Sequence, residues 1–295
     1  MASPTQFEQY IADEVKKYKD VYFPLRSSLL RRLLVRRCPL TKMHPNPDDE
    51  FCIPKIGPSN RIISEYMEAF RNAEKKGDEF CKEPVLIERI YPDGYMILNG
   101  HHRWAAAMRL GYKKMPVKIL NLTQEADVKK SLSRTGNTKR ATLDLDEVVF
   151  LSDSGMAAEK PLPFPFNKLY KEPLRRGIPA LFNFLSSNGY DVWVYTNNYY
   201  SFEHIRSYFR FYHARVAGVI TGLSRKTKAG GSMKKKIDDM MASKYLTTLH
   251  IDNDALLRTS RNSRQFDEYS LDGASDWTQQ IVDIVKRIEK DERQA

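Results

Sequence analysis

The sequence predicts an α/β protein with two domains, an α+β domain followed by a domain built on a parallel sheet. Its 295 residues suffice for two domains of ordinary size, and 41% of them are hydrophobic, which is compatible with normal cores. In the second half, apolar strand-like runs end in small polar or acidic residues, and a helical pattern separates the first two runs. This alternation of strand and helix is typical of a parallel sheet.

The net charge of +11 belongs mainly to the first half of the chain. Residues 1–140 contain 26 Lys and Arg against 17 Asp and Glu, a balance of +9, whereas residues 141–295 contain 22 against 20, a balance of +2. A basic domain attracts nucleic acid, nucleotides and other anionic partners alike. The charge alone therefore does not choose among these partners.

Membrane and secretory segments are not expected. No apolar run approaches the ~20 residues that span a bilayer, and residues 1–10 lack the basic and apolar regions of a signal peptide. Cys38, Cys52 and Cys81 are odd in number and lack Cys-x-x-Cys spacing, so neither a disulfide framework nor a zinc knuckle is indicated. We therefore expect a cytoplasmic protein.

Residues 1–37 are expected to form two helices, at 5–18 and 27–37. The second is amphipathic, with leucines on one side and arginines on the other: Leu29, Leu30, Leu33 and Leu34 against Arg31, Arg32, Arg36 and Arg37. Such a helix either docks on the protein with a solvated basic face or contacts a nucleic-acid backbone.

The first domain is expected over residues 38–122. A helical pattern covers 62–70, and the runs 84–90 and 95–98 flank a turn and predict a hairpin. A helix at 104–110, ended near Gly111, and a closing strand at 115–120 follow.

A turn between the second hairpin strand and the following helix is a candidate site for a nucleotide or another phosphate. A strand that enters a helix through glycine directs free backbone N–H groups outward, and adjacent His and Arg side chains add donors and positive charge. The candidate residues are Asn99, Gly100, His101, His102 and Arg103. Alternatively, the histidine pair caps the helix for stability.

Residues 38–122 resemble the ParB/sulfiredoxin fold, most specifically in the run Gly-His-His-Arg-Trp-Ala-Ala-Ala that begins at Gly100. Sulfiredoxins carry Cys at the place of His101, so sulfinic-acid chemistry is not expected. Chromosome-partition ParB proteins have Gly-Glu-Arg-Arg here and a helix-turn-helix afterwards, which this chain lacks. The free serine kinases of this fold have an Asp-Gly-His motif and an upstream catalytic Glu. This chain has Asn99 in place of that Asp, and Glu50, Asp49 and His44 are the nearest candidates for the upstream base.

Residues 123–140 are polar and basic and are expected to connect the domains. The second domain, 141–295, begins with a strand-like run over 142–150 that holds Asp144 and Asp146. On a paired strand these carboxylates would share one face, and two buried like charges demand a cation or a proton. A divalent metal ion bound by the two carboxylates is the simplest way to meet this demand. The alternative is an edge strand with a solvated acidic face.

Two later strand-like runs also end in polar residues: 191–195 before Thr196, and 246–251 before Asp252 and Asp254. In open parallel sheets, ligands collect beyond the carboxyl ends of the strands, so these ends are expected to converge on one crevice. Helical patterns cover 174–189 and 276–290, the latter with Trp277, Ile281, Ile284, Val285 and Ile288 on its buried side. The polar stretch 258–270 is expected to be a loop.

These features resemble the haloacid dehalogenase (HAD) superfamily of phosphotransferases over residues 141 to about 290. Asp144-Leu145-Asp146-Glu147-Val148 matches its first motif, Thr196 its second, and Asp252 with Asp254 its fourth. The Lys of the third motif has four candidates, of which Lys234 is favoured because Ser232 could cap a helix and place it in the first turn; the others are Lys228, Lys235 and Lys236.

The HAD resemblance implies a role for each motif residue. Asp144 would be the nucleophile that forms an aspartyl-phosphate, and Asp146 the general acid and base. Thr196 and Lys234 would bind the transferring phosphoryl oxygens. The side chains of Asp144 and Asp252 and the backbone carbonyl of Asp146 would hold Mg²⁺.

The expected fold is therefore a ParB/sulfiredoxin-like domain followed by a Rossmannoid HAD-like domain without a full cap, since neither 151–173 nor 199–222 has room for one. The expected function is that of a Mg²⁺-dependent phosphomonoesterase acting on a phosphorylated small molecule or nucleotide. Its first domain binds nucleotide or phosphate, and a kinase activity there stays open. The alternative is a nucleic-acid-binding or end-processing protein that uses the basic first half.

Overall fold

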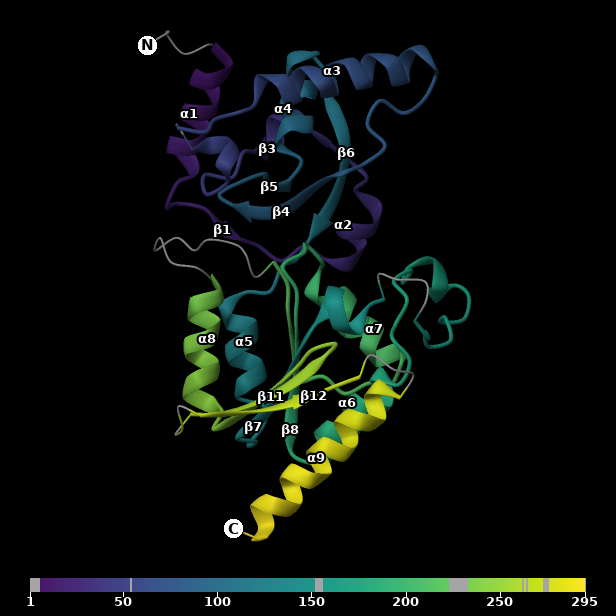
Figure 1. Ribbon diagram of the computed structural model, residues 1–295. Coiled ribbons are helices and arrows are strands. Elements are labelled where there is room, and N and C mark those ends of the chain that lie inside the picture. Colours follow the sequence, from purple (N-terminus) through teal and green to yellow (C-terminus); the bar gives the residue numbers. More distant parts are fainter. Residues whose placement is uncertain are drawn as a thin grey trace. The chain divides into compact units, whose positions relative to one another are not determined.

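The computed structural model describes residues 6–53, 55–151, 156–222, 233–261, 263, 265–272 and 276–294. The chain folds into two compact units that meet in sequence at Asn121 and Leu122. Each unit contains a mixed sheet covered by helices, so the predicted α/β class is confirmed (Figure 1). No helix in the described ranges has the length and apolarity needed to cross a membrane.

The first unit has a sheet in the order β2-β6-β4-β5-β3, with β1 paired to β4. The predicted hairpin is confirmed, because β4 and β5 pair antiparallel, and β6 closes the sheet in parallel with β4. Its elements are α1 (Gln6–Tyr18), β1 (Phe23–Pro24), α2 (Leu29–Leu34), β2 (Arg37–Pro39), β3 (Met43–His44), α3 (Asn60–Lys75), β4 (Val85–Tyr91), β5 (Tyr95–Asn99), α4 (His101–Arg109) and β6 (Lys114–Leu120), with short 3₁₀ turns at Leu40–Lys42 and Glu50–Cys52.

Helix α2 is shorter than predicted, and its leucines do not enter the core. The chain leaves the helix after Leu34 and extends into β2, which pairs antiparallel with β6. Leu29, Leu30 and Leu34 are 60%, 69% and 74% exposed. The leucine side of this six-residue helix is therefore exposed rather than docked on the core.

The second unit has a sheet in the order β12-β11-β10-β7-β8-β9, in which β10, β7, β8 and β9 are parallel. Its elements are α5 (Glu125–Leu132), β7 (Lys139–Asp144), α6 (Ile178–Ser187), β8 (Tyr190–Tyr195), α7 (Phe202–Phe211), β9 (Gly218–Ile220), α8 (Met233–Lys244), β10 (Thr247–Ile251), β11 (Ala255–Ser260), β12 (Phe266–Ser270) and α9 (Trp277–Gln294), with short turns at Leu145–Val149 and Phe166–Lys168.

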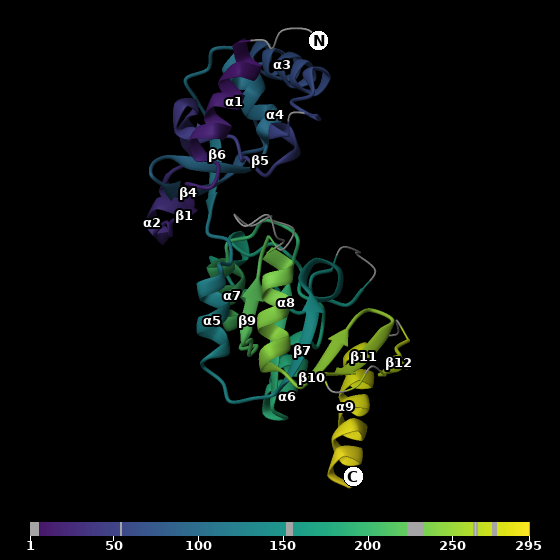
Figure 2. The same cartoon turned by 90° about the vertical axis from the view of Figure 1, so that its left-hand side faces the viewer.

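Two clusters of buried side chains cover the two faces of this sheet. On one face, α5 and α8 pack against Trp193 and Ile220. On the other face, α6, α7 and α9 pack against alternate residues of the same strands (Figures 1 and 2). The five residues predicted for the buried side of α9 are all buried, which confirms the helical pattern.

Three stretches of the second unit differ from the sequence-based expectation. Residues 123–140 include helix α5, whose Val128 lies in the core, so this stretch belongs to the second unit. Residues 258–270 were predicted as a loop, which is wrong: β11 and β12 form an antiparallel hairpin here, and polar strand residues are tolerated because this hairpin edges the sheet. The strand that begins the sheet ends at Asp144, and Leu145–Val149 form one helical turn.

Gly218 supplies a test of the packing in the second unit. A Cβ at this position would overlap the six-membered ring of Trp193, which is fully buried. We expect Gly218→Ala to lower the free energy of unfolding by about 1–3 kcal/mol, because overpacking forces neighbours out of their rotamers. Chemical denaturation measures this change. The control is Gly136→Ala, where a Cβ would meet nothing within 4 Å; equal effects of the two substitutions would contradict the packing.

Candidate functional site

The carboxyl ends of three neighbouring parallel strands bring together residues that are far apart in the sequence. Strand β7 ends at Asp144, β8 ends immediately before Thr196, and β10 ends immediately before Asp252. Because β7 lies between β10 and β8, these three residues follow adjacent strand ends. The predicted convergence of these three strand ends at one edge of the sheet is therefore confirmed.

Asp144 is held by the turn that follows it. Its Oδ1 accepts hydrogen bonds from the backbone N–H groups of Asp146 at 2.8 Å and Glu147 at 2.9 Å. Within the described parts of the chain, Oδ2 makes no hydrogen bond, and Asp144 lines a cleft. One carboxylate oxygen is thus fixed by the backbone while the other is available for chemistry.

Asp146 lies on the turn rather than on a strand, so the idea that it shares a strand face with Asp144 is corrected. Its Oδ2 accepts from the hydroxyl of Thr196 and its Oδ1 accepts from the hydroxyl of Tyr200 at 3.2 Å. Thr196 is buried, and its Oγ1 also accepts from the backbone N–H of Asn198 at 2.9 Å. Burial, followed by the charge of Asp146, raises the pKa of Tyr200, which keeps this hydroxyl a donor at neutral pH.

The cleft beside Asp144 has a volume of about 630 Å³ and lies on the face of the sheet that α8 covers. Its lining combines acidic, basic and hydroxyl groups: Asp144, Asp252, Asp254, Asp238, Lys234, Arg140, His250, Thr142 and Tyr195. Asp146 and Thr196 contact each other but do not line it. Four of the residues predicted for a phosphoryl site thus share one cleft: Asp144, Lys234, Asp252 and Asp254.

Lys234 lines this cleft in the first turn of α8, and neither Lys235 nor Lys236 does. Lys235 and Lys236 are exposed, and the Lys236 ammonium is 3.9 Å from a carboxylate oxygen of Glu125. Lys228 and the predicted capping residue, Ser232, lie outside the described residues. Among the lysines whose positions are described, the geometry therefore favours Lys234.

The donor set fits Mg²⁺ in kind. Across the described ranges, no three His, Cys, Asp or Glu side chains are grouped closely enough to hold a metal ion. The predicted set needs only two carboxylates, Asp144 and Asp252, with the carbonyl of Asp146. Mg²⁺ commonly binds through one or two carboxylates and keeps several waters. Two carboxylates on one cleft are consistent with that habit.

Side chains that sequence reasoning missed hold the loop after β10 against the turn after β7. The Asn253 amide donates to the carbonyl of Glu147 at 3.0 Å and accepts from the guanidinium of Arg175 at 2.7 Å. Arg175 stacks 3.8 Å from the centre of the Trp277 ring, whose N–H donates to the carbonyl of Asp252 at 3.2 Å. These contacts join four distant segments, so no local pattern could have revealed them.

The turn Asn99–Arg103 of the first unit is built around Gly100, which has φ +98° and caps helix α4. A Cβ here would lie 3.0 Å from the Arg103 guanidinium and from Val85, in a backbone conformation that L residues rarely adopt. As at any helix start, the N–H groups of the first three residues have no carbonyl partner within α4. This helix start is therefore suited to an anion.

The two histidines of this turn do not supply the positive charge that was predicted. His101 Nε2 accepts from the N–H of Asn46 at 3.2 Å, and His102 Nε2 accepts from the N–H of Ser59 at 3.2 Å. Burial lowers the pKa of His101 to about 4 and also lowers the pKa of His102, so both rings are neutral at pH 7. The two histidines therefore hold the loop that precedes α3 through hydrogen bonds and add no positive charge.

Arg103 is buried, and its guanidinium binds neighbouring groups of the first unit. Its guanidinium donates to the carbonyl of Glu83 at 2.8 Å and to Oδ1 of Asn99 at 2.9 Å, and it pairs with the Glu83 carboxylate at 2.8 Å. Asn99 and Arg103 thus hydrogen-bond to each other here, and their roles as ligand contacts stay predictions. The backbone of the helix start offers further donors to a phosphate.

The three candidates for an upstream base are now distinguished by position. Oδ1 of Asp49 lies 3.5 Å from Nδ1 of His101 and also accepts from the N–H of Phe51 at 3.0 Å. His44 is buried in a separate network, 2.6 Å from Glu14 and 3.0 Å from the hydroxyl of Tyr18. Glu50 is exposed. Asp49 is the candidate in contact with the motif.

Comparison with known proteins bears on the first unit. Residues 55–135 match the family described as the ParB N-terminal domain. An ADP-dependent L-serine kinase from Thermococcus kodakarensis is 35% identical over 75 residues, covering 25% of this chain and 31% of that protein. An ATP-dependent L-serine kinase from Staphylothermus marinus is 52% identical over 43 residues, covering 14% of this chain and 17% of that protein.

The ParB-like part of the prediction is thereby confirmed. The chain spans less than a third of the length of these two kinases. The crystal structure of a C-terminally truncated chromosome-partitioning protein ParB from Caulobacter crescentus, complexed with CTP-gamma-S, is 24% identical, covers 35% of this chain and 55% of that chain, and has a TM-score of 0.24. The family match ends at residue 135, before the first strand of the second sheet.

Proposed function

We propose that the second unit is a Mg²⁺-dependent phosphomonoesterase of the HAD type. The observation that carries the proposal is the position of Asp144 at the end of β7, between the strands that deliver Thr196 and Asp252. The order β10-β7-β8-β9 puts all three predicted motifs at adjacent strand ends. Lys234 on the same cleft supplies a cation where phosphoryl charge would build.

In the proposed reaction, Oδ2 of Asp144 attacks phosphorus. The bond from phosphorus to the ester oxygen breaks, and an aspartyl-phosphate forms. The leaving oxygen takes a proton from Asp146, and water then attacks phosphorus with Asp146 as its base, which regenerates Asp144. The hydrogen bonds from Asp146 and Glu147 to Oδ1 of Asp144 keep the attacking oxygen oriented during both steps.

Asp146 must move to take part. Both of its oxygens accept hydroxyl hydrogen bonds, from Thr196 and from Tyr200, and it does not line the cleft. Rotation of the side chain toward the cleft would release Thr196 to bind a phosphoryl oxygen. Mg²⁺, held by Asp144, Asp252 and the carbonyl of Asp146, would offset negative charge on the phosphoryl group.

Hydrolysis of an aryl phosphate ester tests this function directly. We expect the full chain to release phosphate with Mg²⁺ present and to stop when a chelator removes the metal. Restoring Mg²⁺ in excess should restore the rate, whereas Ca²⁺ should support it poorly, because Ca²⁺ prefers more ligands at longer distances. An equal rate of phosphate release with and without the chelator would contradict the metal-dependent reaction.

We propose as a second activity that the first unit transfers a phosphoryl group from a nucleotide to a small hydroxylated substrate such as L-serine. The similarity to two L-serine kinases supports this proposal. So do the N–H groups at the start of α4 that have no partner within the helix, which could hold a phosphate, and Asp49 beside His101, which could accept the hydroxyl proton. Formation of phosphoserine by a variant without the Asp144 nucleophile tests it.

A further inference from the structure

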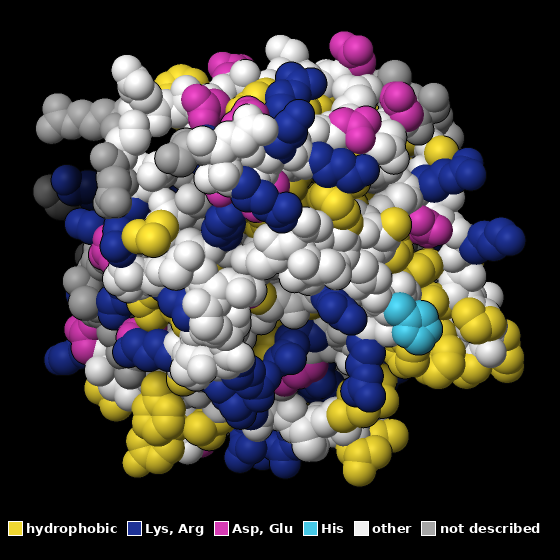
Figure 3. All heavy atoms as spheres, turned by 90° about the horizontal axis from the view of Figure 1, so that it is seen from below, with side chains coloured by type: hydrophobic (Ala, Val, Ile, Leu, Met, Phe, Trp, Pro, Cys, Tyr) yellow, Lys and Arg dark blue, Asp and Glu magenta, His cyan; other side chains and the backbone are white. Residues whose placement is uncertain are grey.

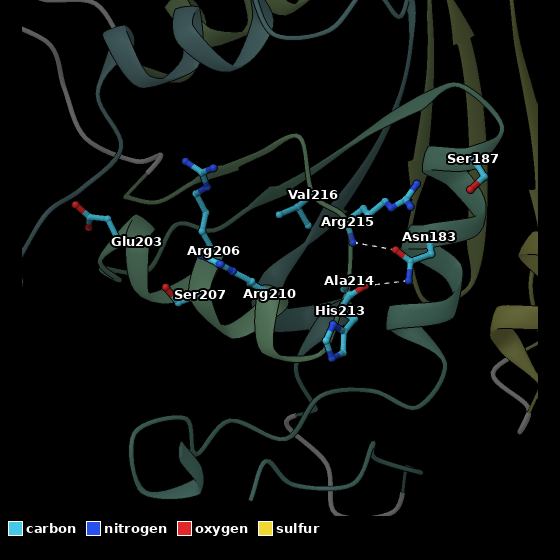
Figure 4. Close-up of a pocket in the computed structure, with 10 residues that line it drawn as sticks. All are labelled: Asn183, Ser187, Glu203, Arg206, Ser207, Arg210, His213, Ala214, Arg215 and Val216. Carbon is cyan, nitrogen blue, oxygen red and sulfur yellow. Dashed lines mark hydrogen bonds between the residues drawn. The ribbon is translucent and has the colours of Figure 1, made fainter. Parts of the chain in front are cut away.

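A second large cavity lies in the second unit, on the face of the sheet covered by α6 and α7, opposite the face that α8 covers. We call it the arginine pocket; its volume is about 860 Å³. It is lined from α6, α7 and the segment before β9 (Figure 4) by Asn183, Ser187, Glu203, Arg206, Ser207, Arg210, His213, Ala214, Arg215 and Val216. The proposed phosphatase reaction uses none of these residues.

The charge of this pocket is positive and unneutralised. Arg206, Arg210 and Arg215 are exposed, and none of them has a carboxylate within ion-pair distance in the part of the chain that the structure describes. Glu203 is the one acidic residue of the described lining. Arg206 and Arg210 are one helical turn apart on α7, about 6 Å along its axis. The pocket therefore attracts an anion with more than one negative group.

Hydrogen bonds from α6 hold the backbone segment that carries Arg215. The Asn183 amide donates to the carbonyl of His213 at 2.9 Å and accepts from the backbone N–H of Arg215 at 3.2 Å (Figure 4). One side chain of α6 thus bridges the segment that presents both Arg215 and His213. Anchoring the backbone lowers the entropy cost of ordering these side chains on a ligand.

The positive surface continues beyond the arginine pocket. Arg206 also lines a smaller cavity of about 110 Å³, together with Lys130 and Arg134 of the α5 region, the acidic Asp127 and the edge strand β9. Five basic side chains therefore follow one another around the β9 edge of the sheet: Lys130, Arg134, Arg206, Arg210 and Arg215. Figure 3 shows one face of the molecule, over which Lys and Arg side chains, in dark blue, are spread. Basic side chains in two neighbouring cavities suit a polyanion better than one phosphate.

Exposed aromatic rings lie on the other side of α7. Phe166 packs on Phe211 with ring centres 4.3 Å apart, and Tyr170 stacks on His204 at 4.4 Å. Phe164, two residues before Phe166 in the chain, is 72% exposed, with the Lys168 ammonium 5.2 Å from its ring centre, and Phe211 is 38% exposed. Exposed aromatic rings on the helix that carries two of the arginines, and on the segment packed against it, suit unpaired bases and their phosphates. An acidic peptide would use the arginines alone.

From these observations we propose that the second unit binds single-stranded nucleic acid along α7, with phosphates in the arginine pocket and bases on the exposed rings of Phe164 and Phe211. Guanidinium groups match phosphate oxygens in pairs, and stacking on aromatic rings tolerates any base. The interaction is selective for unpaired strands and indifferent to sequence. This binding does not depend on the proposed phosphatase chemistry, since it uses a separate surface.

The test is fluorescence anisotropy of a labelled oligothymidylate of about 20 nucleotides titrated with the full chain. We expect the variant Arg206→Ala, Arg210→Ala, Arg215→Ala to bind at least about tenfold more weakly at low salt. The slope of log affinity against log salt should fall by about 2, because each phosphate contact on a single strand contributes about 0.7. The matched control, Lys286→Ala, Lys290→Ala, Arg287→Ala, removes three exposed charges from α9 of the same unit.

The control decides whether the pocket or the overall charge binds. Pocket and control variants that bind equally well would overturn the proposal. Phe164→Ala removes an exposed ring and its contact with Lys168 and should weaken binding about tenfold, the size of one stacking contact. If Phe164→Ala binds as wild type and inorganic polyphosphate competes as well as the oligonucleotide, the pocket is a general anion site and the nucleic-acid assignment is wrong.

Discussion

Replacing Asp144 by Asn should abolish phosphate release by the second unit, lowering its rate about a thousandfold or more, as loss of a nucleophile does in other covalent mechanisms. Asn retains an oxygen that can accept from the N–H groups of Asp146 and Glu147, so the turn after β7 should keep its shape. The oxygen that attacks phosphorus becomes an amide nitrogen. Initial rates on an aryl phosphate at saturating Mg²⁺ measure the loss.

The control for this substitution is Asp239→Asn, which makes the same change of charge at an exposed position of α8. Its rate should stay within about twofold of wild type. Thermal unfolding of both variants should match wild type, which separates lost chemistry from lost folding. If Asp144→Asn keeps its activity while a chelator still removes it, a metal-dependent hydrolase is present but Asp144 is not its nucleophile.

The second large effect concerns the first unit. In an Asp144→Asn background, which prevents the second unit from consuming a phosphorylated product, Asp49→Asn should lower nucleotide-dependent phosphorylation of L-serine by about 10²- to 10⁴-fold. Oδ1 of Asp49 lies 3.5 Å from Nδ1 of His101 in the motif. Asn can still cap the turn that begins at Glu50, so folding should survive. Phosphoserine formed from ATP or ADP is measured by mass spectrometry.

Glu50→Gln is the matched variant, because it neutralises the adjacent exposed carboxylate. It should change the rate by less than about tenfold. If Glu50→Gln lowered the rate more than Asp49→Asn, Glu50 would be the base. The loop that carries both residues would then have to change conformation when substrate binds. Absence of phosphoserine in the Asp144→Asn background itself, with either nucleotide, would reject the kinase proposal.

Local pattern was sufficient for the elements whose burial is strong and periodic. The apolar runs that became β8 and β10 and the buried face of α9 all follow from side-chain spacing along the chain. The hairpin β4–β5 was predictable from its turn residues. Pattern misjudged 258–270, because an edge hairpin can be polar on its exposed positions and so looks like a loop.

Electrostatic expectations fared less well where burial changes the state of a side chain. His101 and His102 read as positive groups next to Arg103, yet burial makes both rings neutral and each accepts a backbone hydrogen bond. Arg103 is committed to Glu83 and Asn99. The sequence shows which polar side chains are present, but their hydrogen-bond and ion-pair partners come from distant segments of the chain.

The sequence by itself determined the α/β class, the polar strand ends at Asp144, Thr196 and Asp252, and the ParB-like motif at Gly100, because each depends on neighbours along the chain. Only the tertiary structure decided that Lys234 lines the cleft, that Asn253 and Arg175 join the two loops beside it, and that Arg206, Arg210 and Arg215 share one pocket. The reason is physical: parallel strands are joined through helices, so the groups that meet at a sheet edge or between helices are separated by long stretches whose packing no local pattern encodes.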